Sequence, residues 1–552
     1  MMTFIILVLI FTVSLAACGD AKENKNNNSN SDNQNEASNN NDDVSMNDEQ
    51  ILDVNIKSEP PSLHPGEAND TFSATVLDQI FEGLTRVDQN GEVTEAMAED
   101  IEVSEDQTTY TFHIRENANW SNGDPVTAED FEYAWKWILD PKNADTDYAY
   151  QLYPIKNAED VKENGMPMDE VGITVEDEKK LIVELEQPTP YFLELTAFMT
   201  YYPLNKNVVE GNKDWSTDAS EDYVTNGPFT LESWQHKDNI VLEKIDDYWD
   251  SETVKLETIN MHMIEDENTE LNMFERGELD RAGAPTGSIP LAAIQSLKEE
   301  NRLNISPKSG VFYYMFNTEE EPFTNKNIRK AFAYAIDRQG IIDNITQTEE
   351  IPAMALVPSA IFEENEVGYF KDNNMEEAKK YLEKGLEELG IDELPEITLS
   401  YFTDEENKNI SEALQDMWKK NLGVDVILDN EEWQVYLNTM SEGDYQVGRL
   451  GWSGDFNDAI NFLEIFQKGG GNNYANWEND EYSNLLKESK TESDPDKRYE
   501  IMRQAEEIFM EEMPVAPIFF YSNVWVQQEN VHDIEVSPLG SVQYKWGWIS
   551  DQ

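Results

Sequence analysis

The first half of the chain places hydrophobic residues at alternate positions, which is the pattern of half-buried β-strands. In ILDVNIK, which begins at Ile51, leucine, valine and isoleucine alternate with polar residues. TTYTFHIR, residues 108–115, places Tyr110, Phe112 and Ile114 on one face and polar residues on the other. Further strands are predicted over 173–185 and 227–249, and a hairpin at Asn90-Gly91.

Helical spacing appears after residue 127 and dominates the second half. Thr127 and Asp130 form a capping pattern, and hydrophobic residues then repeat every three or four positions to Ile138. The same spacing predicts helices over 328–342, 375–390, 410–423 and 431–440, with a strand over 424–428. Helices and strands that alternate at these lengths predict an α/β domain.

The N-terminus has the features of an export signal. Residues 1–17 carry no charge, and their apolar run from Phe4 to Ala17 is shorter than the roughly 20 residues that span a membrane. Cys18, the single cysteine, follows in Leu-Ala-Ala-Cys, which resembles a bacterial lipobox. We therefore expect a signal peptide over 1–17 and a lipidated Cys18 as the mature N-terminus. One cysteine excludes an intrachain disulfide.

Composition adds a tether and a strongly acidic body. Residues 18–48 are rich in Asn, Ser and acidic residues and are predicted to form a flexible linker. The net charge of the 552-residue chain is −72, which argues against nucleic acid as a partner, because phosphate binding needs basic patches. A habitat of high salt or high pH explains such a surface best, and a preference for cationic ligands is the alternative.

Motifs that mark catalysis or metal binding are absent from the sequence. HExxH, GxxxxGK[ST] and GxSxG do not occur, and we expect no enzyme activity, cofactor or metal. The histidines are widely spaced, so any cluster of them would have to form in space. Asp455 follows an apolar run in GWSGDFND, where turn chemistry alone would explain it. A calcium loop at Asp455, Asn457 and Asp458 lacks the later glutamate of an EF-hand.

Several long segments together resemble the oligopeptide-binding lipoproteins of ABC importers, the family-5 extracellular solute-binding class. They are FEGL (81–84), residues 98–135, NGPFTLESW (226–234), NIRKAFAYAIDR (327–338) and YQVGRLGWSGDFNDAINFL (445–463). The resemblance runs in order from about residue 50 to the C-terminus, so it covers almost the whole mature chain.

This resemblance implies an α/β fold of the periplasmic-binding-protein type (type II, cluster C), with two main lobes, a cleft between them and an extra inserted domain. Domain I would comprise 50–82, 204–305 and 520–552. Domain II would comprise 83–203, and domain III 306–519. A peptide would lie enclosed between domains I and III as an added strand, held mainly through its backbone.

The resemblance also implies site residues. Asp455, in Gly-Trp-x-x-Asp, would pair with the α-ammonium of the peptide, and Arg449 would meet a ligand carboxylate; a strand-end ion pair is the alternative for Arg449. Trp433 would line a side-chain pocket unless it is a core residue. The other residues expected in the peptide site are Gly451, Trp452, Ser453, Tyr148, Tyr314 and a strand containing Thr71, Phe72 and Ser73.

The sequence therefore predicts a monomeric, lipid-anchored receptor on the outer face of a bacterial, Gram-positive cell membrane. It would capture oligopeptides and deliver them to an ABC permease, with no nucleic-acid partner. Alternatives are receptors of the same fold for oligosaccharides, nickel complexes or haem, and a peptide-pheromone sensor. An extracellular hydrolase is a further alternative.

Overall fold

The structure is a computed structural model, and it describes residues 45–551 except 89–90, 144–145 and 471. The predicted signal peptide, Cys18 and most of the predicted tether lie outside the described residues. The end of the predicted tether is described: Met46 forms a bridge with Ser550, and the Asn47 amide donates to the Ile549 carbonyl at 2.9 Å. None of the helices in the described part is both long enough and apolar enough to span a membrane.

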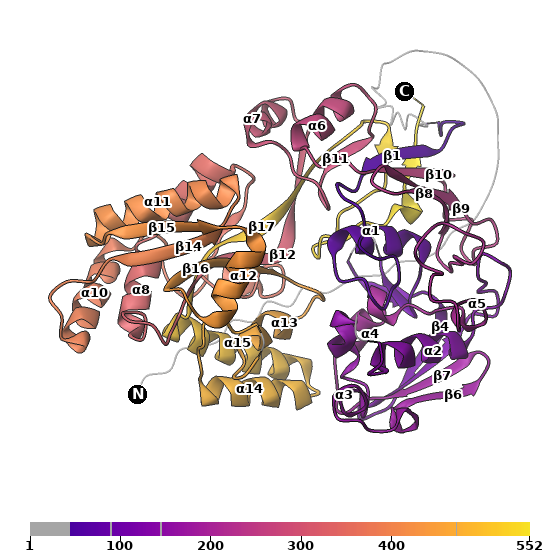
Figure 1. The fold of residues 1–552 in the computed structure, drawn as a ribbon, viewed down its shortest axis with the longest axis horizontal. Helices are drawn as coiled ribbons and strands as arrows, with labels where there is room; N and C mark the ends of the chain where they lie inside the picture. Colours follow the sequence, from indigo (N-terminus) through magenta and orange to yellow (C-terminus); the bar gives the residue numbers. More distant parts are fainter. Residues whose placement is uncertain (1–44, 89–90, 144–145, 471, 552) are drawn as a thin grey trace, which may run out of the picture. The chain divides into compact units, whose positions relative to one another are not determined.

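Two four-stranded sheets come from the first half of the chain (Figure 1). One has the order β1-β10-β9-β8 and the other β4-β5-β7-β6, and a short hairpin pairs β2 with β3. Their strands are β1 (Ile51–Asn55), β2 (Thr85–Val87), β3 (Val93–Glu95), β4 (Ala98–Val103), β5 (Thr109–Ile114), β6 (Ile173–Asp177), β7 (Lys180–Glu184), β8 (Phe229–Gln235), β9 (Asn239–Lys244) and β10 (Thr258–His262). Each strand predicted in this half is confirmed. The β2–β3 pairing confirms a hairpin between these strands, while Asn90 of the predicted turn lies outside the described residues.

The third sheet has the order β11-β17-β12-β16-β14-β15, with β13 paired to β17. Its strands are β11 (Arg281–Gly283), β12 (Leu303–Phe316), β13 (Ile351–Pro352), β14 (Ile397–Phe402), β15 (Val426–Glu431), β16 (Val447–Ser453) and β17 (Val515–Gln527). The antiparallel pair β12 and β17 has irregular register between Pro307 and Val311. The expected domain borders at 305/306 and 519/520 fall inside these two strands.

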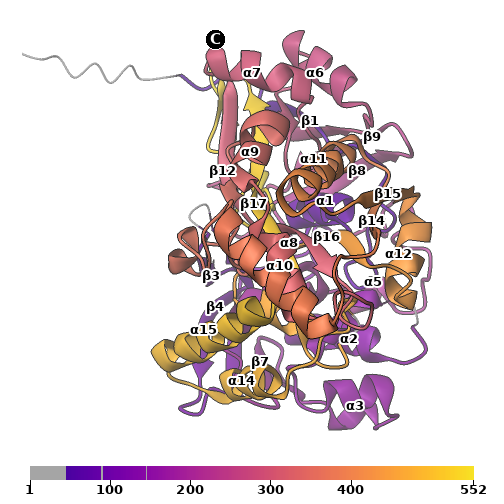
Figure 2. The ribbon, with the colours of Figure 1, turned by 90° about the vertical axis from the view of Figure 1, so that its left-hand side faces the viewer.

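Helices pack against these sheets, and most of their hydrophobic faces form one large core, while α6 and α7 contribute to a second, smaller hydrophobic cluster (Figures 1 and 2). Figure 2 shows α8 and α10 side by side. The longer helices are α1 (Thr71–Ile80), α2 (Ala128–Leu139), α6 (Glu267–Glu275), α7 (Leu291–Glu299), α8 (Lys326–Tyr334), α10 (Met375–Leu389), α11 (Glu405–Leu422), α12 (Trp433–Glu442), α14 (Asp480–Thr491) and α15 (Pro495–Glu512). Short ones are α3 (Ala158–Glu163), α4 (Phe192–Leu195), α5 (Lys206–Val209), α9 (Arg338–Ile341) and α13 (Ile460–Leu463).

The local signals for helix ends are confirmed at several positions. Thr127 and Asp130 form the predicted capping box of α2. Gly390 and Gly423 end α10 and α11 in the left-handed region, with φ of 71° and 75°, where a residue with a Cβ would be strained.

The helix predicted over 328–342 is interrupted. The structure ends α8 at Tyr334 and starts α9 at Arg338, because the Asp337 side chain accepts from the Gly340 amide at 3.0 Å and caps a new helix. The Arg338 side chain is completely buried and donates through Nε to the Pro517 carbonyl at 2.6 Å. This tertiary contact competes with a straight helix.

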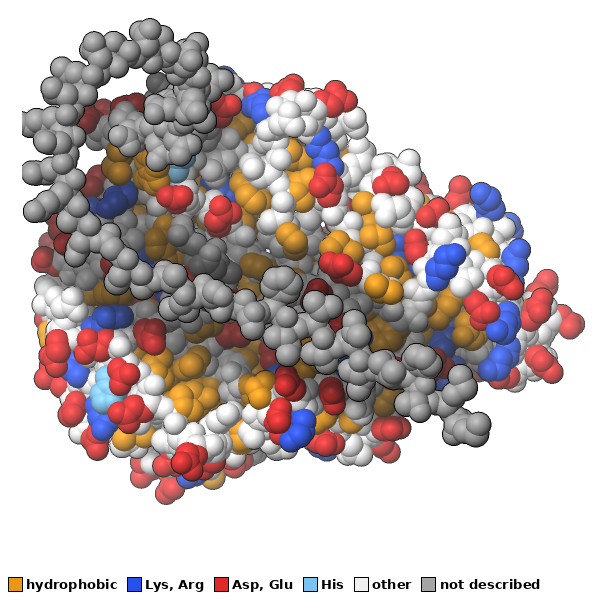
Figure 3. All heavy atoms as spheres, turned by 180° about the vertical axis from the view of Figure 1, so that it is seen from behind, with side chains coloured by type: hydrophobic (Ala, Val, Ile, Leu, Met, Phe, Trp, Pro, Cys, Tyr) orange, Lys and Arg blue, Asp and Glu red, His pale blue; other side chains and the backbone are white. Residues whose placement is uncertain are grey.

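The surface carries the charge that the composition predicts. Figure 3 shows aspartate and glutamate side chains over much of the visible face, with lysines and arginines between them. Such a mixed acidic surface is consistent with the expectation that nucleic acid is not a partner.

Candidate functional site

Asp455 lies in the turn that follows β16, and neighbouring residues hold this turn in place. The Gly454 amide donates to the Ser309 carbonyl at 2.8 Å. The Asn461 side-chain oxygen accepts from Trp452 Nε1 at 2.8 Å and from the Asp455 amide at 3.2 Å. Next in the chain, Asp458 forms two bonds with Arg498, at 2.6 and 2.9 Å. The turn is therefore braced on both sides of Asp455.

Two tyrosine hydroxyl groups donate to the Asp455 carboxylate. Tyr148 and Tyr150 each donate a long hydrogen bond, of 3.4 Å, to one of its oxygens. Burial raises the pKa of Asp455 to about 6, against the effect of the Asn461, Tyr150 and Tyr148 side chains. Among the described residues, no lysine, arginine or histidine forms an ion pair with this carboxylate. An unpaired carboxylate in such a place favours binding of an external cation.

Aromatic and acidic neighbours from the segment 191–194 complete the surroundings of Asp455. The Phe456 ring stacks on Tyr191 with ring centres 4.5 Å apart. The Asn457 amide donates to a carboxylate oxygen of Glu194 at 2.7 Å, and burial raises the pKa of Glu194 to about 7. These contacts join the segment that contains α4 to the turn after β16.

Two cavities share Asp455, Trp452 and Phe456 in their walls. One, of about 440 Å³, is also lined by Thr71, Tyr148, Gly451, Ser453, Lys308 and residues 537–541. The other, of about 510 Å³, is also lined by Tyr150, Tyr191, Asn461 and Glu464. Volumes of this size are typical of small-ligand sites, with few polar groups placed among apolar ones. The structure thus brings together six expected site residues, Thr71, Tyr148, Gly451, Trp452, Ser453 and Asp455.

Arg449 lies on β16, opposite Tyr314 of β12. Its guanidinium carbon is 3.9 Å from the centre of the Phe312 ring and 4.9 Å from that of Phe402. Its Nη2 donates to the Tyr521 hydroxyl at 3.5 Å, and its buried Nε has no hydrogen-bond partner. No ion pair to Arg449 occurs in the described part of the chain, so the strand-end ion pair considered from the sequence is absent. Aromatic rings hold this cation and leave it able to bind an anion.

Trp433 and Tyr314 differ in their exposure. Trp433, the first residue of α12, is 42% exposed, so it is not a core residue; its ring packs edge-on against Phe402, at 4.8 Å. Phe402 therefore contacts both Trp433 and Arg449. Tyr314 is completely buried, and its hydroxyl forms a 2.9 Å hydrogen bond with Ser411.

The expectation of a strand at Thr71, Phe72 and Ser73 is wrong. These residues form the first turn of α1. Asp70 caps the helix, because its carboxylate accepts from the Phe72 and Ser73 amides at 2.9 and 3.0 Å. Those amides are therefore occupied by the cap and are not available as a strand edge. Ser73 is buried, whereas Thr71 lines the 440 Å³ cavity.

Sequence reasoning missed several residues that surround Asp455. Tyr150 could have been found, since it lies two positions after Tyr148 in an aromatic-rich segment. Asn461 and Glu194 carry no comparable signal. They approach Asp455 through α13 and α4, elements too short to be recognised from hydrophobic spacing.

Comparisons with known proteins agree on one group of relatives. A sequence profile of the bacterial extracellular solute-binding proteins, family 5 (middle region), matches residues 92–474. The oligopeptide-binding protein OppA of Bacillus subtilis is 51% identical over 549 residues, which is 98% of each chain.

Solved structures give the same result. Haemophilus influenzae OppA in complex with RPPGFSPFR is 30% identical, with a TM-score of 0.77 over 92% of this chain and 100% of that one. Listeria monocytogenes OppA bound to peptide is 32% identical, with a TM-score of 0.74 over the same shares. The expected periplasmic-binding-protein-like α/β fold is thereby confirmed.

Proposed function

Since the chain belongs to the bacterial extracellular solute-binding proteins of family 5, we propose that it captures oligopeptides outside the cell membrane and delivers them to an ABC importer. Relatives named for oligopeptide binding match 98% and 87% of its length, and two solved neighbours hold peptides. The family is one of solute-binding proteins and not of enzymes, and we propose that this chain performs no covalent chemistry.

The observation that carries this proposal is the unpaired carboxylate of Asp455 in the walls of two cavities. A peptide presents an α-ammonium, which would form a charge-assisted hydrogen bond with this group. Arg449, stacked between aromatic rings, would bind a carboxylate of the ligand. Trp433, together with Phe402, would line a pocket for a side chain. Extended peptide backbone would run along Gly451, Trp452 and Ser453.

The finer features of the receptor rest on the sequence. We propose that Cys18 carries the lipid anchor, that the chain acts as a monomer and that the expected domains I, II and III close on the ligand. Strands β12 and β17 would form the hinge, because both expected borders with domain III fall inside them. A single lipid chain anchors marginally, so a diacylated cysteine would be needed for stable retention.

A peptide titration, followed by chemical analysis of the recovered peptide, tests the proposal. The purified protein is titrated with a tetrapeptide in high salt, and the recovered peptide is analysed by mass spectrometry. We expect saturable binding of one peptide, recovered intact. Cleaved peptide would support a hydrolase, and no heat with the peptide but saturation with an oligosaccharide would support a sugar receptor. Either result would contradict the proposal.

Affinity should depend on pH through Asp455. The bound ammonium favours the ionised carboxylate, while a pKa of about 6 makes the free site largely protonated at pH 5. Binding should therefore weaken by about tenfold between pH 7.5 and pH 5. Calorimetry at both pH values checks this, with Asp455→Asn as the reference for other titrating groups. Equal pH dependence in the two proteins would contradict the assignment.

A further inference from the structure

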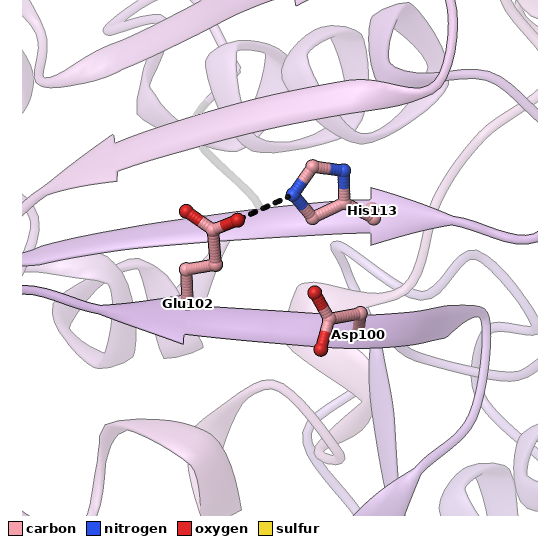
Figure 4. A group of neighbouring side chains, drawn as sticks. All are labelled: Asp100, Glu102 and His113. Carbon is pink, nitrogen blue, oxygen red and sulfur yellow. Dashed lines mark ion pairs between the residues drawn. The ribbon is translucent and has the colours of Figure 1, made fainter.

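A histidine and two carboxylates meet on the outer side of the sheet β4-β5-β7-β6. Strand β5 buries Tyr110, Phe112 and Ile114, so its alternate residues, including His113, lie on the other face. Asp100 is the register partner of His113 across the antiparallel pair, and Glu102 lies two residues further along β4. Figure 4 shows the three side chains on one side of the two strands, with both carboxylates near the imidazole.

The geometry of this cluster resembles an open metal site. One ligand atom from each of Asp100, Glu102 and His113 lies within 4.8 Å of the other two. His113 Nε2 is 3.4 Å from Glu102 Oε1, about the separation of two ligands on a tetrahedral ion with bonds of ~2.1 Å. The remaining adjustment is small for surface side chains, because Glu102 is 69% exposed.

An unsatisfied nitrogen provides the second observation. His113 Nε2 is shielded from solvent and has no hydrogen-bond partner among the described residues, although it faces a carboxylate. Buried polar atoms in proteins are almost always paired, so such an atom calls for an explanation. Lys180, the neighbour of His113 on β7, forms its close ion pair with Glu176 at 2.5 Å and also interacts electrostatically with Glu102.

We propose that Asp100, Glu102 and His113 form a binding site for one divalent first-row transition metal ion such as Zn²⁺. An imidazole ligand favours Zn²⁺ and other first-row transition metal ions over Ca²⁺ and Mg²⁺, and the two carboxylates balance the charge of the ion. Water would complete the coordination. The ion would link β4, which lies at the edge of its sheet, to β5. This site is independent of the peptide cleft, so it stands or fails separately from the proposed function.

Metal titration tests the site. The protein is stripped with chelator, dialysed and titrated calorimetrically with Zn²⁺ in excess Ca²⁺, which occupies sites made only of oxygen. We expect one equivalent of Zn²⁺ to bind, with affinity more than tenfold lower in His113→Ala and in Asp100→Asn, because loss of an outer partner alone costs 10–100-fold. Zn²⁺ should also raise the thermal midpoint of the wild type but not of His113→Ala.

His236→Ala is the matched control. His236 is another surface histidine next to a carboxylate, with Nδ1 2.6 Å from Glu59 Oε1, but no third ligand is grouped with it in the described structure. This variant should bind Zn²⁺ as the wild type does. If His113→Ala folds poorly, the Zn²⁺ affinity of Asp100→Asn is the deciding measurement, because this substitution replaces a single atom of an exposed side chain. Equal Zn²⁺ affinity in the wild type and Asp100→Asn, or no uptake by the wild type, would overturn the proposal.

Discussion

Replacing Asp455 by asparagine should lower affinity for a free-amine tetrapeptide by about 10²- to 10⁴-fold. The substitution keeps the shape of the side chain but removes the charge that would pair with the ligand's ammonium. Loss of one partner of a desolvated ion pair costs roughly 3–5 kcal/mol, which corresponds to that change in affinity. Calorimetric titration of both proteins in high salt measures it.

Asp429→Ala is the control for this substitution. Asp429 is exposed on β15 of the same sheet and lines neither cavity that contains Asp455. Its removal changes the net charge by the same amount, so it reports any long-range effect of charge alone. We expect wild-type affinity in this variant. A similar loss in both variants would show that Asp455 acts only through the general field of the acidic surface.

Glu506→Ala should destabilise the part of the protein that contains residues 356–369 by about 3–5 kcal/mol. Glu506 is completely buried in α15, and burial raises its pKa. Its carboxylate accepts from the Leu356 and Val357 amides, at 3.0 and 2.7 Å, and from Arg503 at 2.9 Å. Asn365 and Tyr369 also donate to it. Truncation would leave all of these donors without their acceptor.

Hydrogen exchange of the Leu356 and Val357 amides measures this effect directly. Both should exchange much faster in Glu506→Ala and only moderately faster in Glu506→Gln, whose amide oxygen can still accept. Glu507→Ala, at the next, exposed position of α15, should leave their protection unchanged. Unchanged protection in Glu506→Ala would mean that this carboxylate does not hold the segment.

The fold could be predicted well where the sequence carries a local signal. The alternation of Tyr110, Phe112 and Ile114 is typical of a half-buried strand and is found as β5. Tertiary contacts override such signals elsewhere. The helix that hydrophobic spacing alone extends to 342 is interrupted where Asp337 caps α9, next to the buried Arg338. The helix α1 shows another case: the resemblance implied a strand at Thr71, Phe72 and Ser73, whereas the Asp70 side chain caps a helix that starts there.

The site could be predicted only in part. Asp455 and Trp452 follow one another closely, so one motif identifies both. Tyr150 and Asn461 contact Asp455 from other elements. These contacts depend on the tertiary fold and leave no signal in the local sequence. The same holds for Asp100 and His113, which lie thirteen positions apart and become neighbours through the β4–β5 register. Widely spaced histidines therefore gave no sign of a metal site.

The most direct test of the account compares a tetrapeptide with its N-acetylated twin on the wild type and on Asp455→Asn. Acetylation removes the ammonium without changing the rest of the ligand, so the four affinities form a double-mutant cycle. The account predicts that acetylation weakens binding to the wild type about as much as the substitution does, and has little further effect on Asp455→Asn. Equal affinity of the wild type for both peptides would contradict the pairing of Asp455 with the peptide's N-terminus.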